Sequence, residues 1–141
     1  MVDVDVNETP ISDDASLLIV DDEVNLRLQL AKAMDRRGFQ ADVAESVADG
    51  IRAVEARPPK YAVIDLRLDD GSGLEVVETL RRVRPDARIV VLTGYGNIAT
   101  AVAAVKAGAV DYLPKPADAD QVAAALLADG STLPPPPDRP M

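Results

Sequence analysis

The stretch that decides the fold is "LLIVDDE", residues 17–23, in which four apolar residues run directly into three acidic ones. A short run that is apolar throughout, rather than alternating, favours a strand covered on both faces. The acids after it have two interpretations. They could cap a following helix, whose N-terminus attracts negative charge, or they could belong to a site at the end of the strand. The rest of the chain has to separate these interpretations.

The same kind of run recurs along the chain. "YAVID" (61–65) and "RIVVLT" (88–93) are strongly apolar and β-branched, whereas "QADVA" (40–44) and "VDYL" (110–113) are weaker candidates. Together with residues 17–20 they predict five strands.

Segments with helical spacing follow each predicted strand. The first carries Leu26, Leu30 and Met34 on one stripe and ends at Gly38, as a helix C-cap would. The fourth, residues 98–107, is rich in Ala, and we expect it to be a buried helix; a low-charge exposed face there would instead suit a partner or a second copy. The other three are predicted at residues 47–54, 74–81 and 118–128.

Five strand–helix units with short connections require a parallel sheet between two layers of helices, because right-handed crossovers place helices on both faces. A core of about 110 residues is too short for an eight-fold barrel. The predicted fold class is therefore α/β, with an open, doubly wound, five-stranded parallel sheet. In this architecture ligands bind beyond the carboxyl ends of the strands.

Composition excludes several kinds of function. The chain has 141 residues, no Cys, no His and a net charge of −9. It therefore lacks thiolate and imidazole metal ligands and His-dependent catalysis, and it is a poor match to DNA or to an anionic membrane. A metal would have oxygen ligands, which favours Mg²⁺ or Ca²⁺.

The two ends differ from the middle. Residues 1–15 are polar and acidic, which predicts a flexible tail, and residues 130–141 contain four consecutive prolines, which predict an extended linker. The domain itself is expected at residues 16–129. No apolar run reaches the length of a membrane span and no signal peptide is recognisable, so we expect a cytoplasmic protein without membrane contact.

Polar residues stand where the strong strands end. Asp21 and Asp22 follow the first, Asp65 ends the third, Thr93 ends the fourth, and Lys115 follows the fifth. These ends lie at one edge of a parallel sheet, so acids, a hydroxyl and an ammonium group are expected to meet there. Helix capping does not predict Asp65 or Lys115 in this set, which favours a site.

Carboxylates packed together repel one another unless a cation lies between them, and Mg²⁺ commonly uses one or two carboxylates while leaving positions for phosphate oxygens. Asp21 and Asp22 are the expected metal ligands. Asp65, a lone acid at the tip of a central strand, is the expected nucleophile toward phosphorus. Lys115 and Thr93 would hold the incoming phosphoryl oxygens.

These residues resemble the receiver domains of two-component response regulators, over residues 16–128. The resemblance rests on the acid pair, Asp65, Thr93 and "KP" at 115–116. It implies a flavodoxin- or CheY-like (βα)5 fold with strand order 2-1-3-4-5. It also implies phosphorylation of Asp65 by a sensor histidine kinase, and Mg²⁺ bound by the acids and by the backbone carbonyl of Arg67.

The resemblance further implies a switch. Thr93, Tyr95, Tyr112 and Pro116 would respond to phosphorylation, with a change in the face formed by the fourth helix, fifth strand and fifth helix. The bond before Pro116 is expected to be cis. The domain would not be an enzyme acting on other substrates, although it would catalyse its own phosphotransfer and autodephosphorylation.

A narrower resemblance is visible in "DLRLDDGSGLEVVE" (65–78), in "VVLTGYGNIATAVAAVKAGAVDYLPKPAD" (90–118) and in the proline-rich linker. These stretches are similar to the RegA, PrrA and ActR group of redox-responsive global regulators. The resemblance implies a DNA-binding domain of the helix-turn-helix type after the linker, which this chain lacks. A homodimer formed on phosphorylation is a further expectation, since a low-charge exposed face of the Ala-rich helix would suit a second copy.

Two features depart from the wider family. Leu68 and Asp69 replace the Met-Pro of many receivers, which leaves the geometry and charge of this loop open, and Arg67 and Tyr95 flank the phosphoryl site. We expect Arg67 and Tyr95 to affect the lifetime of the acyl phosphate. Two alternatives remain: an Mg²⁺-dependent phosphatase with an aspartate nucleophile, and a phosphate-independent interaction module of the same fold.

Overall fold

The computed structural model describes residues 14–94 and 98–128. Of the predicted tails at 1–15 and 130–141, only Asp14 and Ala15 are described. The rest of both tails and Tyr95 lie outside the described residues. In chain order the elements are β1 (Ser16–Val20), α1 (Val24–Arg36), β2 (Gln40–Ala44), α2 (Val47–Ala56), β3 (Tyr61–Asp65), β4 (Arg67–Leu68), β5 (Gly71–Ser72), α3 (Leu74–Val83), β6 (Arg88–Thr93), α4 (Ile98–Lys106), β7 (Asp111–Pro114) and α5 (Ala119–Leu127).

The main sheet is parallel and has the order β2-β1-β3-β6-β7. Counted along the chain as the five strands of this sheet, the order is the predicted 2-1-3-4-5. The predicted fold class is therefore confirmed. One element was not predicted: β4 and β5 form a separate two-stranded antiparallel hairpin directly after β3.

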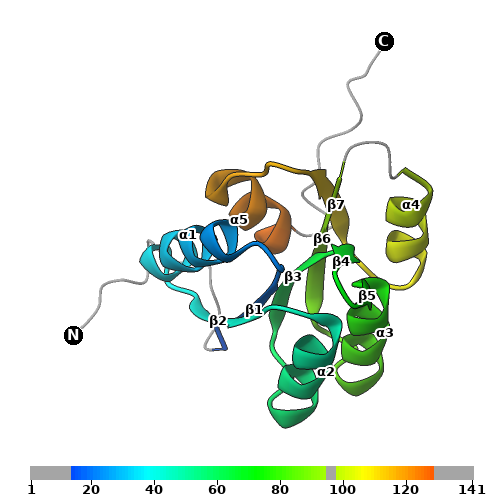
Figure 1. Ribbon diagram of the computed structural model, residues 1–141. Coiled ribbons are helices and arrows are strands. Elements are labelled where there is room, and N and C mark those ends of the chain that lie inside the picture. Colours follow the sequence, from blue (N-terminus) through cyan, green and yellow to red (C-terminus); the bar gives the residue numbers. More distant parts are fainter. Residues whose placement is uncertain (1–13, 95–97, 129–141) are drawn as a thin grey trace.

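Helices cover both faces of this sheet (Figure 1). Helices α1 and α5 pack on one face, and α2, α3 and α4 pack on the other. Each face of the sheet has its own apolar core. The core beneath α2, α3 and α4 includes Val20, Ile64 and Leu80, and the core beneath α1 and α5 includes Ile19, Met34 and Leu126. All of these side chains are at most 1% exposed, so the sheet is a rigid platform for the loops at its edge.

Burial follows the position of each strand in the sheet. Every residue of β3 is buried, whereas the edge strands β2 and β7 are mostly exposed or half-buried. A central parallel strand is covered on both faces, which explains why its sequence is apolar throughout. An edge strand needs fewer apolar residues, which explains the weaker signals at 40–44 and 110–113.

Left-handed glycines close two of the helices. Gly38 follows the C-cap of α1 with a φ of 98°, and Gly108 follows α4 with a φ of 123°. This backbone region favours glycine over residues with a Cβ, so both predicted helix ends have a steric cause. The acids before α1 do not cap it, because the N-cap residue Glu23 makes no side-chain capping bond.

Helix α4 corrects one expectation. It is not a buried helix: only Ala101 and Ala104 are buried, while Ile98 is 62% exposed and Val102 and Val105 are exposed as well. The helix packs on the sheet through small residues and presents its larger apolar ones to solvent. The alternative of a low-charge exposed face is the one that the structure supports.

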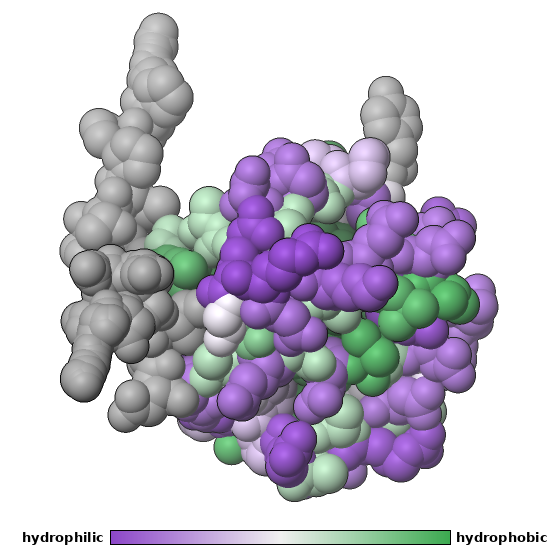
Figure 2. Space-filling view, turned by 90° about the vertical axis from the view of Figure 1, so that its left-hand side faces the viewer, coloured by the Kyte–Doolittle hydropathy of each residue, from purple (hydrophilic) through white to green (hydrophobic). Residues whose placement is uncertain are grey.

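The face that carries α1 and the edge strand β2 is mostly hydrophilic, with small separate apolar patches (Figure 2). Val24, Leu28 and Val43 are the exposed large apolar residues of these two elements. In the part of the chain that the structure describes, no helix is both long enough and apolar enough to cross a lipid bilayer.

The described chain starts with an anchored acid. The Asp14 carboxylate accepts hydrogen bonds from the Ser16 amide (3.1 Å) and hydroxyl (2.6 Å), and it pairs with Arg84 at 2.6 Å. These contacts lower the pKa of Asp14 to about 2, the bonds from Ser16 having the largest effect. The start of β1 is thus fixed to the C-terminal end of α3.

The Asp14 contacts predict a pH dependence of stability. Because the pKa is lower in the folded state than the usual 3.8, the stabilisation is complete above pH 4 to 5 and is lost as the pH falls toward 2. Asp14→Asn should therefore be less stable than the wild type at pH 6, with the difference shrinking at pH 3. Urea unfolding at both pH values measures this, and an equal difference at the two would contradict it.

Candidate functional site

The predicted site residues meet at the carboxyl edge of the sheet. Asp21 follows β1, Asp65 ends β3 and Thr93 ends β6, and all three are at most 5% exposed. Buried ionisable groups are uncommon in apolar cores unless they are paired, so two buried acids on neighbouring strands mark this edge as chemically distinct.

Three carboxylates form a group that could hold a metal ion. One oxygen each from Asp21, Asp22 and Asp65 lies within 4.8 Å of the others. Backbone amides orient two of these acids: Glu23 N–H donates to Asp21 Oδ1 at 2.9 Å, and Arg67 N–H donates to Asp65 Oδ1 at 3.0 Å. The second oxygen of each is left for other partners.

The buried oxygen Asp21 Oδ2 shows that the group fits a cation. It accepts no hydrogen bond from any described residue, and the described cation that pairs with it is Lys115, with Nζ at 3.3 Å. A buried carboxylate oxygen without a donor is costly. An oxygen-ligated divalent ion would satisfy it, which is the donor chemistry that Mg²⁺ prefers.

Lys115 supplies the positive charge of the site. Its Nζ lies 2.9 Å from Asp65 Oδ2 and 3.4 Å from Glu23 Oε1, in addition to the contact with Asp21. Burial alone would lower the pKa of Lys115, but the hydrogen bond and attraction to Asp65, followed by those to Asp21, outweigh it and raise the pKa. The ammonium group is therefore charged over the whole physiological pH range.

Asp65 experiences opposing effects. Burial is the largest and raises its pKa, and the nearby Asp21 adds to this, while the Arg67 amide and Lys115 act in the opposite direction. The net direction is upward. The ionised carboxylate is thus less stabilised than in water, a condition that favours its reaction with an electrophile.

The loop after Asp65 is held close to the site by Gly73. A Cβ at this position would lie 2.1 Å from the backbone oxygen of Asp65 and 2.8 Å from Ile64 Cγ2. Gly73 N–H also donates to the Leu66 carbonyl at 3.0 Å. The close approach of two backbone segments requires glycine here, with no side chain between α3 and the end of β3.

Gly73→Ala should therefore destabilise the fold by about 3 kcal/mol, because the new methyl group overlaps with backbone rather than with a flexible side chain. Gly94→Ala is the matched control, since a Cβ there meets no described atom within 4 Å. Urea unfolding of the two variants measures the difference. Equal stabilities would show that the loop can move away from Asp65 without cost.

A shallow cavity of about 340 Å³ opens above the acids. A larger one of about 610 Å³ lies between β1, β2 and the C-terminal end of α2, away from the acids. We place the site at the smaller cavity because the charged groups converge there. The residues lining it are Asp22, Glu23, Asp65, Arg67, Leu68, Asp69, Gly94 and Lys115.

The structure settles the loop that departs from the family pattern. Leu68 is 7% exposed and pairs with Gly71 in the β4–β5 hairpin. Asp69 lines the cavity, and the neighbouring negative charge of Asp22 raises its pKa. Asp70 accepts hydrogen bonds from the first amides of α2, those of Val47 (2.8 Å) and Ala48 (3.1 Å). Sequence reasoning missed this Asp70 anchor, because its partners lie more than 20 residues away.

The predicted switch residues that the structure describes differ in exposure. Thr93 is buried, and its carbonyl accepts a hydrogen bond from the Lys115 amide at 2.9 Å. The Lys115–Pro116 bond is cis, as predicted. Tyr112 is 37% exposed on β7. Tyr95 lies outside the described residues.

Comparison with known proteins identifies the family. The family described as "Response regulator receiver domain" matches residues 17–127. This chain belongs to it. The receiver domain is thus part of a two-component response regulator, and the recognition made from the acid pair, Asp65, Thr93 and Lys115 is confirmed.

Curated relatives narrow the group. The receiver is 66% identical over 134 residues to the photosynthetic apparatus regulatory protein RegA of Rhodovulum sulfidophilum, covering 95% of this chain and 73% of the relative. It is 60% identical over 131 residues to the acid tolerance regulatory protein ActR of Rhizobium meliloti (strain 1021), covering 93% of this chain and 68% of the relative. The RegA, PrrA and ActR resemblance is confirmed.

A solved structure has the same fold. It is a crystal structure of a response regulator protein from Burkholderia pseudomallei with a phosphorylated aspartic acid, a calcium ion and citrate. The TM-score is 0.76 at 41% sequence identity, covering 80% of this receiver and 66% of that chain.

Proposed function

We propose that this receiver domain accepts a phosphoryl group on Asp65 from the phosphohistidine of a sensor kinase, with Mg²⁺ as cofactor. One observation carries the proposal. Asp65 is 3% exposed, yet its carboxylate borders an open cavity, contacts Lys115 at 2.9 Å and lies within 4.8 Å of the acid pair.

The transfer is a displacement at phosphorus. Asp65 Oδ2 or Oδ1 supplies the electron pair of the new P–O bond, the P–N bond of the donor breaks, and its electron pair returns to the donor imidazole. The chain has no His of its own. A donor histidine would therefore lie outside these 141 residues, which fits a separate histidine kinase.

Asp21, Asp22, Asp65 and the backbone carbonyl of Arg67 are the proposed Mg²⁺ ligands. When bound, the ion would neutralise charge on the transferring phosphoryl oxygens. The solved relative from Burkholderia pseudomallei contains a phosphorylated aspartate and a divalent ion, which supports this chemistry in the family.

Lys115 and Thr93 are proposed to hold the phosphoryl group after transfer. Phosphorylation adds negative charge beside Lys115, which creates a charge-assisted contact. If Thr93 contributes a bond in only one arrangement of the loop after β6, the population of that arrangement rises. Thr93, Tyr95, Tyr112 and Pro116 would relay the change to the surface formed by α4, β7 and α5.

The same groups explain a limited catalytic role. Acids, metal and ammonium would promote phosphotransfer to Asp65 and later hydrolysis of the acyl phosphate, without turnover of external substrates. Arg67, which lines the cavity, and Tyr95 are proposed to affect the lifetime of the acyl phosphate.

The remaining assignments concern the whole regulator. We propose a flexible tail at residues 1–15, the receiver at 16–129 and a linker at 130–141 that leads to a DNA-binding domain beyond this chain. DNA contact belongs to that domain, since the net charge of this chain is −9. A homodimer is proposed to form on phosphorylation. The site of action is the cytoplasm, where the kinase obtains ATP.

Incubation with acetyl phosphate and Mg²⁺, followed by intact-mass spectrometry, tests the proposal. The expected result is one added phosphoryl group, absent when EDTA replaces Mg²⁺. No adduct in either buffer would support a phosphate-independent module. Continuous release of phosphate from several organic phosphates would instead support a phosphatase.

A further inference from the structure

Arg27 is a buried arginine next to the site that the proposed chemistry does not use. It lies in α1 and is only 9% exposed. Its NH1 donates to the backbone carbonyl of Asp21 at 2.7 Å, and its Nε has no hydrogen-bond partner among the described residues. Its nearest carboxylate partner is Glu45, at 3.9 Å from NH2.

Ion pairing does not account for this burial. The Glu45 side chain is 66% exposed and its distance is at the limit of a salt bridge, so the pair contributes little. A buried guanidinium with a free Nε is costly. Among the described residues, the one short contact of the guanidinium is with Asp21, so the function of Arg27 should be sought in what it does to Asp21.

The contact completes the fixation of Asp21. Its amide donates to the Ala44 carbonyl at 3.0 Å, its carbonyl accepts from Arg27, and its Oδ1 accepts from the Glu23 amide at 2.9 Å. Backbone position and side-chain rotation are thus both determined. The remaining atom, Oδ2, is the buried one that faces Lys115.

We propose that Arg27 is a positioning residue for the metal site: by holding the Asp21 carbonyl, it keeps the acid pair in the geometry that binds Mg²⁺. The inference rests on the proposed function, because it assumes that the acid pair binds the ion. Arg27 does not contact the cavity and is not expected to touch the phosphoryl group.

Charge and position predict opposite results, which makes the inference testable. Removing a buried cation next to Asp21 would, by charge alone, strengthen the binding of another cation. Loss of positioning would weaken it, because partners that orient metal ligands typically contribute about 10- to 100-fold to affinity. The sign of the change therefore distinguishes the two effects.

The experiment compares Arg27→Met with Arg88→Met. Arg88 is the matched control: its guanidinium also donates to a backbone carbonyl, from Nε to that of Leu126 at 2.6 Å, but it begins β6 at the opposite end of the sheet from the acids. Isothermal titration calorimetry with MgCl₂ gives the affinity directly. We expect Mg²⁺ binding to weaken about tenfold in Arg27→Met and to stay at the wild-type value in Arg88→Met.

Phosphorylation by acetyl phosphate gives a second readout. In Arg27→Met the rate should fall at low Mg²⁺ and return to about the wild-type rate at saturating Mg²⁺, because the reacting atoms are untouched. If Arg27→Met does not fold, Arg27→Gln replaces it: the Gln amide is polar, but it ends two bonds short of the NH1 position that contacts the Asp21 carbonyl.

Unchanged or tighter Mg²⁺ binding in the Arg27 variant would overturn the inference and leave the proposed function intact. Equal weakening in Arg88→Met would also overturn it, since the effect would then be a general loss of stability. A wild-type domain that binds no Mg²⁺ would remove the proposed metal site, and the inference with it.

Discussion

Asp65→Asn should take up no phosphoryl group from acetyl phosphate under conditions in which the wild type is fully modified. The amide lacks the anionic oxygen that forms the P–O bond. Asn is nearly the same size as Asp, so the packing around this 3% exposed side chain should be retained. Intact-mass spectrometry of both proteins after the same incubation with Mg²⁺ measures the difference.

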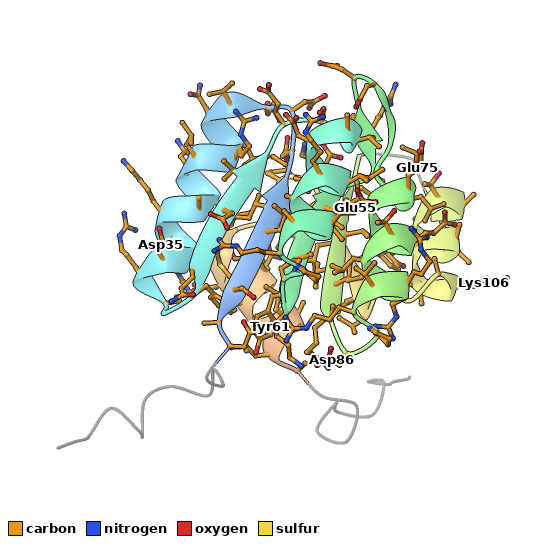
Figure 3. All side chains as sticks on the ribbon, turned by 90° about the horizontal axis from the view of Figure 1, so that it is seen from below. Asp35, Glu55, Tyr61, Glu75, Asp86 and Lys106 are labelled. Atoms are coloured by element: carbon orange, nitrogen blue, oxygen red, sulfur yellow. The ribbon has the colours of Figure 1, made fainter. Side chains whose placement is uncertain are left out.

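Asp86→Asn is the control for Asp65→Asn. Asp86 carries the same charge but lies near Tyr61, the first residue of β3, at the opposite end of the sheet (Figure 3). It should be modified like the wild type. An adduct of equal yield in Asp65→Asn would place the phosphoryl group on another residue and reject the assignment.

Lys115→Met should lower the rate of phosphorylation by about 10²- to 10³-fold, the effect typical of removing one donor to a developing oxyanion. The ammonium group lies 2.9 Å from Asp65 Oδ2, where it can contact both the nucleophile and the phosphoryl oxygens. Met keeps most of the length of the side chain without its charge. Time courses of acetyl phosphate modification at saturating Mg²⁺ give the rate.

Lys60→Met controls for the loss of a half-buried, ion-paired lysine. The Lys60 side chain is 23% exposed and pairs with Asp86 at 3.2 Å, compared with 20% exposed for Lys115. The Lys60→Met variant should be somewhat less stable than the wild type but should be phosphorylated at the wild-type rate. If the Lys115→Met rate stayed within about threefold of the wild-type rate, the prediction would be wrong, because the ammonium group would then contribute far less to the rate than one oxyanion donor typically does.

The sequence predicted those parts of the fold that have a local cause. "YAVID" and "RIVVLT" are apolar throughout because β3 and β6 are covered on both faces, and they were located correctly. Gly38 and Gly108 end helices because their φ values are positive. The acids converge because parallel strands end at one edge of the sheet, so the sequence alone predicts that Asp21 and Asp65 lie together.

The sequence did not predict features that give too short a signal or a signal with two interpretations. The β4–β5 hairpin has only two residues per strand, too few for a periodic signal. Arg27 lies three residues before Leu30 and seven before Met34, on the same buried stripe of α1. Because arginine is usually exposed, the sequence did not predict its burial. The Ala-rich segment 98–107 was predicted to be a buried helix because its charge is low, although only Ala101 and Ala104 of helix α4 are buried.

The site also explains why a stable domain would keep costly groups. Asp21, Arg27 and Asp65 are buried polar residues at the edge of an apolar core. Replacing such groups by apolar ones often stabilises a protein, so their presence is better explained by chemistry than by folding. The rigid sheet below them holds the geometry, and the loops above leave the cavity open.

The position of the phosphoryl group is the most direct test of this account. Borohydride reduces an acyl phosphate to an alcohol and releases inorganic phosphate, so a phosphorylated aspartate is converted to homoserine. Tandem mass spectrometry of the digested protein then locates the change. The account predicts homoserine at position 65 and at no other acid, whereas conversion at Asp21, Asp22 or Asp69, with Asp65 unchanged, would contradict it.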